Sequence, residues 1–213
     1  MKFKNANEAF EWLYKRVSNG ETFGDTKACF NMGFTIEDPI ERSITSPFRG
    51  WSEEYAEAEW QWYLSGDPST KKLGELYGKI PAIWDRMSDS DGNVRSNYGW
   101  QWNRNHQLDK VIALLRTNAD TRQAVISIYD GKEIETYRKD TPCTYAVQFT
   151  IIKGKLFMSV YMRSNDVWFG YCNDQYCFSK LQELVAEQVG IPIGEYYHHA
   201  HNMHIYNNFL NRN

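Results

Sequence analysis

TPCTYAVQF, Thr141 to Phe149, is the stretch from which the fold of this chain can be read. It opens an apolar, β-branched run that predicts a strand over 144–152, and a second such run follows over 156–162. The triplet Lys153-Gly154-Lys155 between the two runs is typical of a tight turn. The two runs therefore predict a β-hairpin.

Cys143 and Arg163 lie almost symmetrically about that turn, so the hairpin is expected to bring them close together. A cation within a few ångströms lowers the pKa of a thiol and keeps its nucleophilic form populated. Cys143 is thus a candidate nucleophile, and Arg163 could also grip a phosphate. The simpler alternative is that Cys143 is a small hydrophobic residue, as most lone cysteines after a proline are.

Polar and charged residues continue after Arg163 in the segment MRSNDVWFGYCND, which ends at Asp174. Its two carboxylates, Asp166 and Asp174, could hydrogen-bond to a polar ring. Few structural roles place so many polar groups beside two good strands. We therefore interpret this segment as part of a binding site.

The remaining elements alternate between helices and strands without a strict βαβ rhythm. Hydrophobic periodicity predicts helices over 6–18, 52–65, 106–116 and 174–189, and strands over 28–36, 123–129 and 202–206. Ser52 and Gly66 are typical start and stop signals for the second helix, and a polar loop is expected over 87–97. We therefore expect one domain, residues 1–213, with an α+β fold and a large mixed or antiparallel sheet flanked by helices.

The composition argues against several classes of protein. A net charge of -3 and a pI near 6.0 disfavour a dedicated nucleic-acid-binding protein. No apolar run reaches the roughly 18–20 residues of a membrane helix. The N-terminus shows no continuous apolar stretch with a cleavage site, so we expect no secretion signal and a cytoplasmic protein. The 4 cysteines are unevenly spaced and are expected to be reduced thiols.

Glu59 is a second candidate for chemistry. It shares a face of the predicted helix 52–65 with Tyr55, Trp62 and Tyr63. A carboxylate among aromatic rings is desolvated, so its pKa should rise into a range useful for proton transfer. The alternative is an ordinary solvated glutamate on a helix surface.

The stretch YYHHAHNMHIY contains four histidines, His198, His199, His201 and His204. No cysteine or acidic residue near them has a recognisable zinc spacing, so we do not favour a metal site. Alternation along a strand would instead point Asn202, His204 and Tyr206 to one side, as a sugar-binding site needs.

Several motifs together resemble one protein family. TPC and QF within 141–149, RSNDVWFG at 163–170 and HIY at 204–206 follow the order and spacing of the thymidylate synthase superfamily, as do the upstream AEWQWYLSGD, IWD and NYGW. The similarity runs from about residue 20 to residue 207. Within the superfamily, NYGW, the Cys-Thr pair and MRSNDVWFGYCND look most like the phage deoxycytidylate hydroxymethylases.

This resemblance implies a thymidylate synthase-like fold that forms a homodimer through its large sheet. It implies a pyrimidine deoxynucleoside monophosphate as substrate, 5,10-methylenetetrahydrofolate as carbon donor, and no metal. By position, Cys143 would attack C6 of the pyrimidine, so that C5 becomes a carbon nucleophile and captures the folate methylene. Glu59 would manage protons and ordered water, and Tyr98 would help to position water or the proton to be removed.

The resemblance also assigns binding residues, grouped by the part of the ligands that they contact. These are Arg163, Ser164 and, from across the homodimer, Arg122 for the 5′-phosphate; His204 and Tyr206 for the deoxyribose 3′-hydroxyl; and Trp84, Asp166 and Gly170 for the folate.

Asp174 would decide which base is bound. The uracil enzymes of the family carry an asparagine here, whose amide matches O4 and N3 of uracil. Cytosine presents a 4-amino donor and an N3 acceptor. A carboxylate accepts from the amino group and, if protonated or water-bridged, also serves N3. Against uracil it would set acceptor against acceptor, which costs roughly 1–3 kcal/mol, about ten- to a hundredfold in selectivity.

The chain departs from the family pattern at several positions. Thr22 stands where a loop arginine usually contacts the phosphate, with Lys27 nearby, and an arginine pair is reduced to Arg122-Gln123. Thr144 stands where most thymidylate synthases have a histidine, and Met87 stands in place of a second cofactor-side tryptophan.

The chain also ends at Asn213, soon after HIY. Without a longer C-terminal tail to close the site, water is expected to trap the reaction intermediate as a hydroxymethyl group. The expected activity is therefore conversion of deoxycytidylate to 5-hydroxymethyldeoxycytidylate, as a source of modified DNA precursors in the cytoplasm of a phage-infected cell. The alternatives are a thymidylate synthase or hydroxymethylase acting on dUMP, a non-catalytic nucleotide-binding homologue, and a thiol-redox or zinc protein built on Cys172, Cys177 and the histidines.

Overall fold

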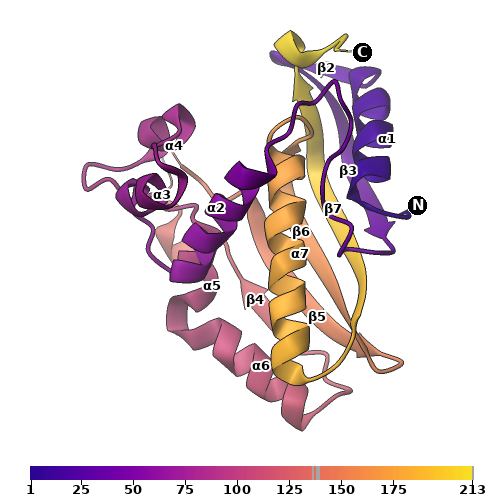
Figure 1. The fold of residues 1–213 in the computed structure, drawn as a ribbon, viewed down its shortest axis with the longest axis vertical. Coiled ribbons are helices and arrows are strands. Elements are labelled where there is room, and N and C mark those ends of the chain that lie inside the picture. Colours follow the sequence, from indigo (N-terminus) through magenta and orange to yellow (C-terminus); the bar gives the residue numbers. More distant parts are fainter. Residues whose placement is uncertain (136, 138–139, 213) are drawn as a thin grey trace.

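A single large sheet organises the molecule (Figure 1). The computed structural model describes residues 1–135, 137 and 140–212. Within them, the sheet has seven strands in the order β1-β3-β7-β6-β5-β4, and β2 pairs with β3 beside this path. The strands are β1 (Lys2–Phe3), β2 (Glu21–Phe23), β3 (Thr26–Ile36), β4 (Val125–Ser127), β5 (Thr144–Ile152), β6 (Lys155–Asp166) and β7 (Ile193–Tyr206).

Helices of very different length accompany the sheet. They are α1 (Ala6–Ser18), α2 (Glu53–Ser65), α3 (Thr70–Tyr77), α4 (Ala82–Met87), α5 (Tyr98–Asn103), α6 (Gln107–Thr117) and α7 (Gly170–Val189), with single 3-10 turns η1 (Arg104–His106), η2 (Gly131–Glu133) and η3 (Asn207–Phe209). None of the described helices is both long and apolar enough to cross a lipid bilayer.

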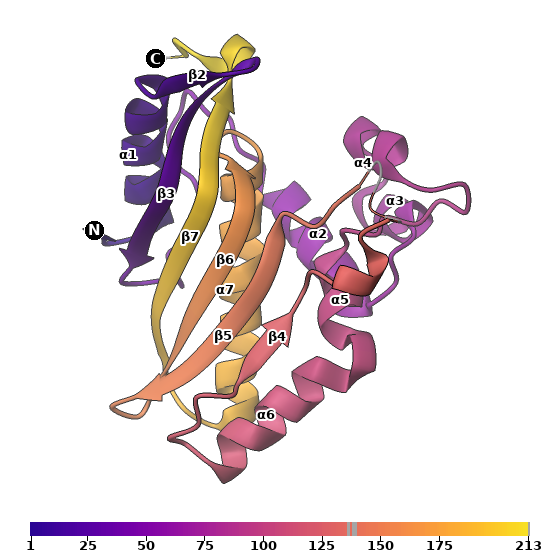
Figure 2. The ribbon, with the colours of Figure 1, turned by 180° about the vertical axis from the view of Figure 1, so that it is seen from behind.

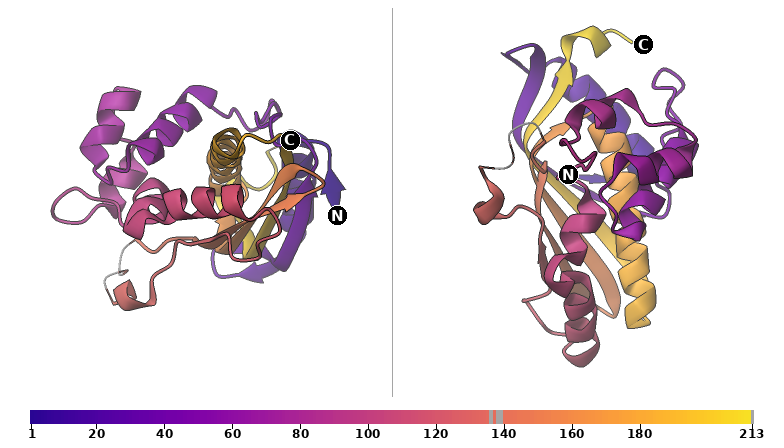
Figure 3. Two further views of the ribbon diagram at one scale, coloured as in Figure 1. Left: turned by 90° about the horizontal axis from the view of Figure 1, so that it is seen from below. Right: turned by 90° about the vertical axis from the view of Figure 1, so that its left-hand side faces the viewer.

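The helices cover only one face of the sheet. α7 runs along that face, α1 lies beside it over β3, and α2 packs on α7 (Figure 1). The segment α3–α5 extends beyond the β4–β5 edge (Figure 3). Figure 2 shows the opposite face, over which none of the described helices lies. The predicted α+β class with a mixed sheet is confirmed, because β6–β7 and β1–β3 pair in parallel and the other neighbours pair antiparallel.

The predicted hairpin is present as β5 and β6. Ile152 pairs with Lys155, and the two residues between them, Lys153 and Gly154, both have left-handed backbone angles, φ 50° and 73°. Two successive positive φ angles define the two-residue hairpin turn whose twist matches the twist of the strands.

The sequence signals at the ends of α2 also act as predicted. The Ser52 side chain accepts the backbone N–H of Tyr55, which satisfies one free donor of the first turn. Gly66 ends the helix in the left-handed conformation at φ 66°. The predicted stop of α7 at Gly190 is likewise confirmed, at φ 82°.

Several predicted boundaries were wrong. The strand predicted over 156–162 extends to Asp166 as β6. α7 begins at Gly170 rather than 174, so Asp174 lies inside the helix. β7 begins at Ile193 rather than 202, because its polar and aromatic residues alternate with buried ones from the start of the strand. The strand expected over 123–129 is limited to β4, Val125–Ser127. The short helices α3, α4 and α5 were not predicted at all.

A kink crosses the middle of the sheet. On β7, the buried side chains are at even positions up to Ala200 and at odd positions from Met203, and on β6 the same change occurs between Met162 and Asn165. The regular pairing skips Arg163 and His201 at this level. Beyond the kink, odd-numbered rather than even-numbered residues face the helices. The burial of the polar residues that follow the kink therefore cannot be predicted from the alternation before it.

Candidate active site

The two segments singled out first meet at one end of the β5–β6 hairpin. The backbone N–H of Arg163 donates to the carbonyl oxygen of Cys143 at 2.8 Å. Nη2 of Arg163 lies 3.7 Å from Sγ of Cys143. The predicted proximity of the thiol and the guanidinium group is confirmed.

Main-chain oxygens hold the guanidinium group in this place. Nε of Arg163 donates to the carbonyl oxygen of Pro142 at 3.0 Å, and Nη2 donates to that of Thr141 at 2.8 Å. Both acceptors lie in the residues directly before Cys143. The local backbone thus fixes a permanent positive charge next to the sulfur atom.

The expectation that Arg163 keeps Cys143 ionised was wrong for the resting site. Burial raises the pKa of the thiol to about 11, and the nearby Arg163 only partly offsets this effect. The carboxyl groups of Asp174, Asp140 and Asp166 raise it further. Cys143 therefore rests as a neutral thiol, and its proton must leave as the sulfur attacks.

Glu59 lies inside the protein, on α2, with 3% of the residue exposed. The hydroxyl groups of Tyr63 and Tyr55 donate to its Oε1 at 3.2 Å and 3.4 Å. Burial raises the pKa of Glu59 to about 7, and the two hydroxyl groups partly oppose the increase. The predicted desolvation among rings is confirmed, and a pKa near 7 suits a group that both accepts and releases a proton.

Trp84 on α4 connects to the same carboxyl group. Its Nε1–H donates to the hydroxyl oxygen of Tyr55 at 2.7 Å, and its ring meets Trp62 edge-on at 5.4 Å. The ring is partly exposed, so one side is available for a flat ligand.

Asp174 lies in the second turn of α7. Nδ2 of Asn165 donates to its Oδ2 at 2.7 Å. Burial raises the pKa of Asp174 well above its ordinary value, the neighbouring Glu59 raises it further, and the Asn165 hydrogen bond opposes these effects. This environment favours the protonated form of the Asp174 carboxyl group, which has one O–H donor and a remaining acceptor.

Tyr98, the first residue of α5, is buried beside Cys143 and Asp174. Its ring lies 5.0 Å from that of Phe178 and 5.5 Å from that of Tyr63. Burial raises its pKa, the neighbouring Asp174 and Cys143 raise it further, and hydrogen bonding to Thr144 opposes these effects. The structure thus brings Tyr98 together with the candidate nucleophile and the candidate base-reading residue.

Ser164, His204 and Tyr206 occupy one surface of the sheet beyond the kink. Oγ of Ser164 lies 3.5 Å from Nδ1 of His204, and the rings of His204 and Tyr206 are 5.4 Å apart. Met203 and Ile205, which alternate with them, are buried in the core. The predicted alternation of polar groups on one side of this strand is confirmed.

Asp166 orders the start of α7. Its Oδ1 and Oδ2 accept the backbone N–H groups of Trp168 and Phe169 at 3.1 Å and 2.9 Å. Burial raises its pKa, while those backbone donors and His204 oppose the increase. Its folate contact stays a prediction, and the structure gives it a backbone role that the sequence did not indicate.

Gly170 lies where a side chain would not fit. A Cβ atom at this position would lie 2.8 Å from Nδ2 of Asn165 and 3.3 Å from Oδ2 of Asp174. Any other residue would therefore disturb the hydrogen bond between those two side chains.

Arg122 is the predicted site residue that the chain does not bring to the others. It is exposed, between α6 and β4, and its carbonyl oxygen accepts Nε2 of Gln148 at 3.4 Å. Gln148 is five residues along β5 from Cys143, a distance of about 17 Å in an extended strand. The action of Arg122 on the phosphate bound by a partner subunit therefore stays a prediction.

The histidine-rich stretch does not converge on a common point. His198 faces the core, and His199 and His201 are partly or fully exposed. Among the described residues, no three histidine, cysteine, aspartate or glutamate side chains lie close enough to hold a metal ion. The four cysteines, Cys29, Cys143, Cys172 and Cys177, are free thiols in the structure, as predicted.

Sequence reasoning missed Asn165, the hydrogen-bond partner of Asp174. Asn165 follows the kink, so the alternation of β6 before Arg163 places it on the wrong face. The signal in the sequence was an asparagine within the charged motif RSND, and its burial is visible only in the structure.

Comparisons with known proteins identify relatives of this chain and of its fold. The family pattern described as "Thymidylate synthase" matches residues 49–212. Among solved structures, "Thermostable thymidylate synthase A" from Bacillus subtilis superposes with a TM-score of 0.78 at 20% identity, covering 95% of this chain and 80% of that one. At this identity the superposition shows the fold alone.

Two curated proteins show the range of relatives. A "Deoxycytidylate 5-hydroxymethyltransferase" from Enterobacteria phage T6 is 36% identical over 160 residues, 70% of this chain and 63% of the relative, which is less than two thirds of its length. A "Thymidylate synthase" from Bacillus mojavensis is 28% identical over 210 residues, 94% of this chain and 73% of the relative. Together with the fold and the grouped residues, these matches show that the chain belongs to the thymidylate synthase family.

Proposed function

We propose that this protein transfers a one-carbon unit from 5,10-methylenetetrahydrofolate to C5 of deoxycytidylate and releases 5-hydroxymethyldeoxycytidylate and tetrahydrofolate. The observation that carries the proposal is an Asp174 carboxyl group, hydrogen-bonded by Asn165 in surroundings that favour its protonated form, near a cysteine–arginine pair. The arginine–thiol pair suits a nucleotide whose C6 is attacked, and a carboxylic acid offers cytosine the acceptor and the donor that it needs.

The residues divide the chemistry between them. Sγ of Cys143 adds to C6 and forms a C–S bond while its S–H bond breaks, the proton would pass to the carboxylate of Glu59, directly or through water, and the π electrons of the C5–C6 bond move to C5. Glu59, with a pKa of about 7, can take up and return protons at the ring, and Tyr98 can position the proton that C5 later loses. Arg163 and Ser164 would anchor the phosphate, and His204 and Tyr206 the deoxyribose.

The folate would supply the one-carbon unit at the oxidation level of formaldehyde. The partly exposed ring of Trp84 can stack on a flat heterocycle, and Gly170 keeps the backbone open beside Asp166 and Asp174. Water would then complete the hydroxymethyl group, and departure of Cys143 would restore the C5–C6 double bond.

The test is a comparison of dCMP and dUMP with labelled methylenetetrahydrofolate. We expect label in 5-hydroxymethyl-dCMP, no dihydrofolate, and a kcat/KM for dCMP at least tenfold above that for dUMP. Dihydrofolate formation with dUMP would establish methylation instead. This second candidate is supported by the thymidylate synthase relative, which matches 94% of the chain. Failure to release tritium from C5 of either nucleotide would leave a non-catalytic homologue.

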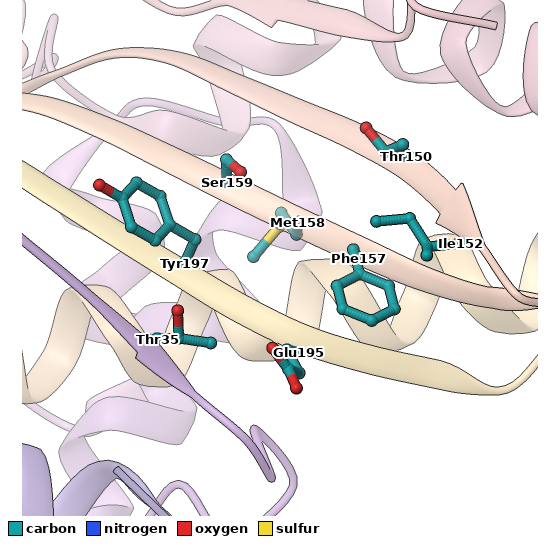
Figure 4. A pocket seen from close by; sticks show the side chains of 8 residues that line it. All are labelled: Thr35, Thr150, Ile152, Phe157, Met158, Ser159, Glu195 and Tyr197. Carbon is teal, nitrogen blue, oxygen red and sulfur yellow. The ribbon is translucent and has the colours of Figure 1, made fainter. Parts of the chain in front are cut away.

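We further propose that two copies pair through the uncovered face of the sheet. Aromatic residues gather there, with Tyr145 stacked on Tyr161 at 6.1 Å and Tyr161 next to Tyr197 at 6.4 Å. A shallow hollow on this face is lined by residues of β3, β5, β6 and β7 (Figure 4), namely Thr35, Thr150, Ile152, Phe157, Met158, Ser159, Glu195 and Tyr197. An exposed surface of this kind on a sheet favours association.

Mixing two inactive variants tests the dimer and Arg122 together. If Arg122 acts on the partner's phosphate, combined Cys143→Ala and Arg122→Ala proteins should regain activity after subunit exchange, because one mixed site has both residues intact. Light scattering on the same samples should give twice the monomer mass. A dimer without recovered activity would show that Arg122 does not act across the interface.

A further inference from the structure

Three buried polar residues behind Asp174 have no part in the proposed chemistry. Asn165 contacts Asp174 at 2.7 Å, Oδ1 of Asn165 lies 3.0 Å from Nε2 of His198, and Nδ1 of His198 lies 2.7 Å from the hydroxyl oxygen of Tyr196. The four side chains form one continuous line from β7 through β6 into α7.

This line is enclosed on all sides. Asn165 is 2% exposed, and His198 and Tyr196 are fully buried. The imidazole of His198 stacks on Phe34 at 5.3 Å and meets the ring of Tyr171 edge-on at 5.6 Å. Polar groups at such depth are costly unless they are paired, so each member depends on the next for its hydrogen bond.

The hydrogen bonds along this line all donate in the same direction. Burial lowers the pKa of His198 to about 3, so its ring is neutral and carries one N–H. Oδ1 of Asn165 can only accept, and therefore the N–H is on Nε2, leaving Nδ1 to accept the Tyr196 hydroxyl. Each donor then points toward Asp174, and Oδ2 of Asp174 receives the last N–H.

A free carboxylic acid would not discriminate between the two bases. With its proton on one oxygen it offers an acceptor to the 4-amino group of cytosine and a donor to N3. With the proton on the other oxygen it offers a donor to O4 of uracil and an acceptor to N3–H. Base preference therefore requires a group that holds the proton in one arrangement.

We propose that Asn165, oriented by His198 and Tyr196, is the positioning residue that makes Asp174 prefer one base. Its N–H occupies Oδ2 and favours that oxygen as the carbonyl, so the proton stays on Oδ1. The inference rests on the proposed function, since it takes Asp174 as the group that reads the base. Gly170 supports it independently, because the absence of a Cβ there leaves room for this hydrogen bond.

The experiment measures kcat/KM for dCMP and for dUMP in wild type and in Asn165→Leu. Leucine keeps the branched shape and the number of heavy atoms of the side chain and removes both hydrogen bonds. We expect the dCMP:dUMP ratio to fall at least tenfold, mainly through faster turnover of dUMP, because the proton of Asp174 can then move to either oxygen. Tyr196→Phe, which removes one distant hydroxyl group, should lower the ratio about threefold.

Rescue and control variants separate positioning from general damage. His198→Gln retains an N–H near the position of Nε2, so its ratio should stay closer to wild type than that of His198→Leu. Gln175→Leu is the matched control, since Gln175 is fully buried next to Asp174 and bonds the carbonyl oxygens of Arg42 and Cys172 instead. It should lower the melting temperature without moving the ratio.

The outcomes distinguish this inference from the proposed function. A wild-type preference for dUMP would contradict the proposed substrate, whatever the variants do. An unchanged ratio in folded Asn165→Leu, or an equal shift in Gln175→Leu, would overturn the inference. If Asn165→Leu does not fold, the dCMP:dUMP ratio of kcat/KM in Tyr196→Phe and in the two His198 variants tests the inference instead.

Discussion

The two ends of the candidate site are built in different ways. At the hairpin end, main-chain carbonyl groups hold Arg163 next to Cys143. At the helix end, side-chain groups of Tyr55, Tyr63 and Asn165 hold Glu59 and Asp174. The first arrangement follows from strand pairing, and the second depends on the identity of each neighbour.

This difference sets the charge state of the site. The permanent charge belongs to the hairpin end, whereas burial makes the two helix-end acids weaker. A site with one fixed cation and two carboxyl groups of raised pKa is suited to bind a phosphate and to exchange protons with a ring.

The largest expected effect comes from removing the sulfur at the hairpin end. Cys143→Ala should lower the release of tritium from C5-labelled nucleotide to background, since no covalent adduct at C6 can form. Nucleotide binding, measured by calorimetry, should change less than about threefold. Retained tritium release would disprove the nucleophile assignment.

At the helix end, Glu59→Gln should lower kcat by about 10²–10⁴-fold with little change in nucleotide binding, because an amide cannot transfer the proton. Glu57→Gln is the control on the same helix. Its carboxyl group pairs with Tyr176 and Lys180 away from the site. A similar loss of kcat in both variants would argue against a proton-transfer role for Glu59.

The raised pKa of Glu59 also predicts a pH-dependent stability. The folded protein holds this proton from the ordinary value of 4.5 up to about 7, whereas the unfolded chain has released it. Stability should therefore fall as pH rises through this window, by roughly 3 kcal/mol at about 1.36 kcal/mol per pH unit.

Glu59→Gln lacks this pH dependence. The free energy of unfolding of the variant, relative to that of wild type, should therefore rise by about 3 kcal/mol between pH 4.5 and pH 8. Urea unfolding of both proteins at both pH values measures the change. A constant difference between the two curves would show that Glu59 is not desolvated in solution.

The smallest expected effect changes specificity rather than rate. Asp174→Asn replaces a carboxylic acid by an amide, which matches O4 and N3 of uracil. The dCMP:dUMP ratio of kcat/KM should fall about ten- to a hundredfold. The variant keeps the volume of the side chain, so its melting temperature should stay close to that of wild type, and an unchanged ratio would remove Asp174 from base recognition.

The hairpin end could be predicted because its signals are local. A Lys-Gly-Lys turn and two apolar runs fix which residues pair, and the proximity of Cys143 and Arg163 follows from counting. The capped helix α2 was predicted for the same reason. The state of the thiol was not, because burial depends on the whole fold and outweighs the neighbouring arginine.

The helix end could be predicted only in part. Periodicity placed Glu59 on a face with Tyr55 and Tyr63, which the structure confirms. The short helices α3–α5 lack a long apolar stripe, so hydrophobic periodicity does not predict them. The role of Asn165 was not predicted because the buried positions on β6 change from even-numbered to odd-numbered residues at the kink.

That kink divides the sheet into two parts in which residues of opposite parity face the core. Deletion of His201 alone would leave Met203 and Ile205 in phase with the buried residues before it, but it would shift the rest of β7 by one position, so that His204 no longer lies opposite Asp166. His201 thus keeps β7 in register with both neighbouring strands while Met203 and Ile205 stay in the core and His204 and Tyr206 stay on the surface of the candidate site.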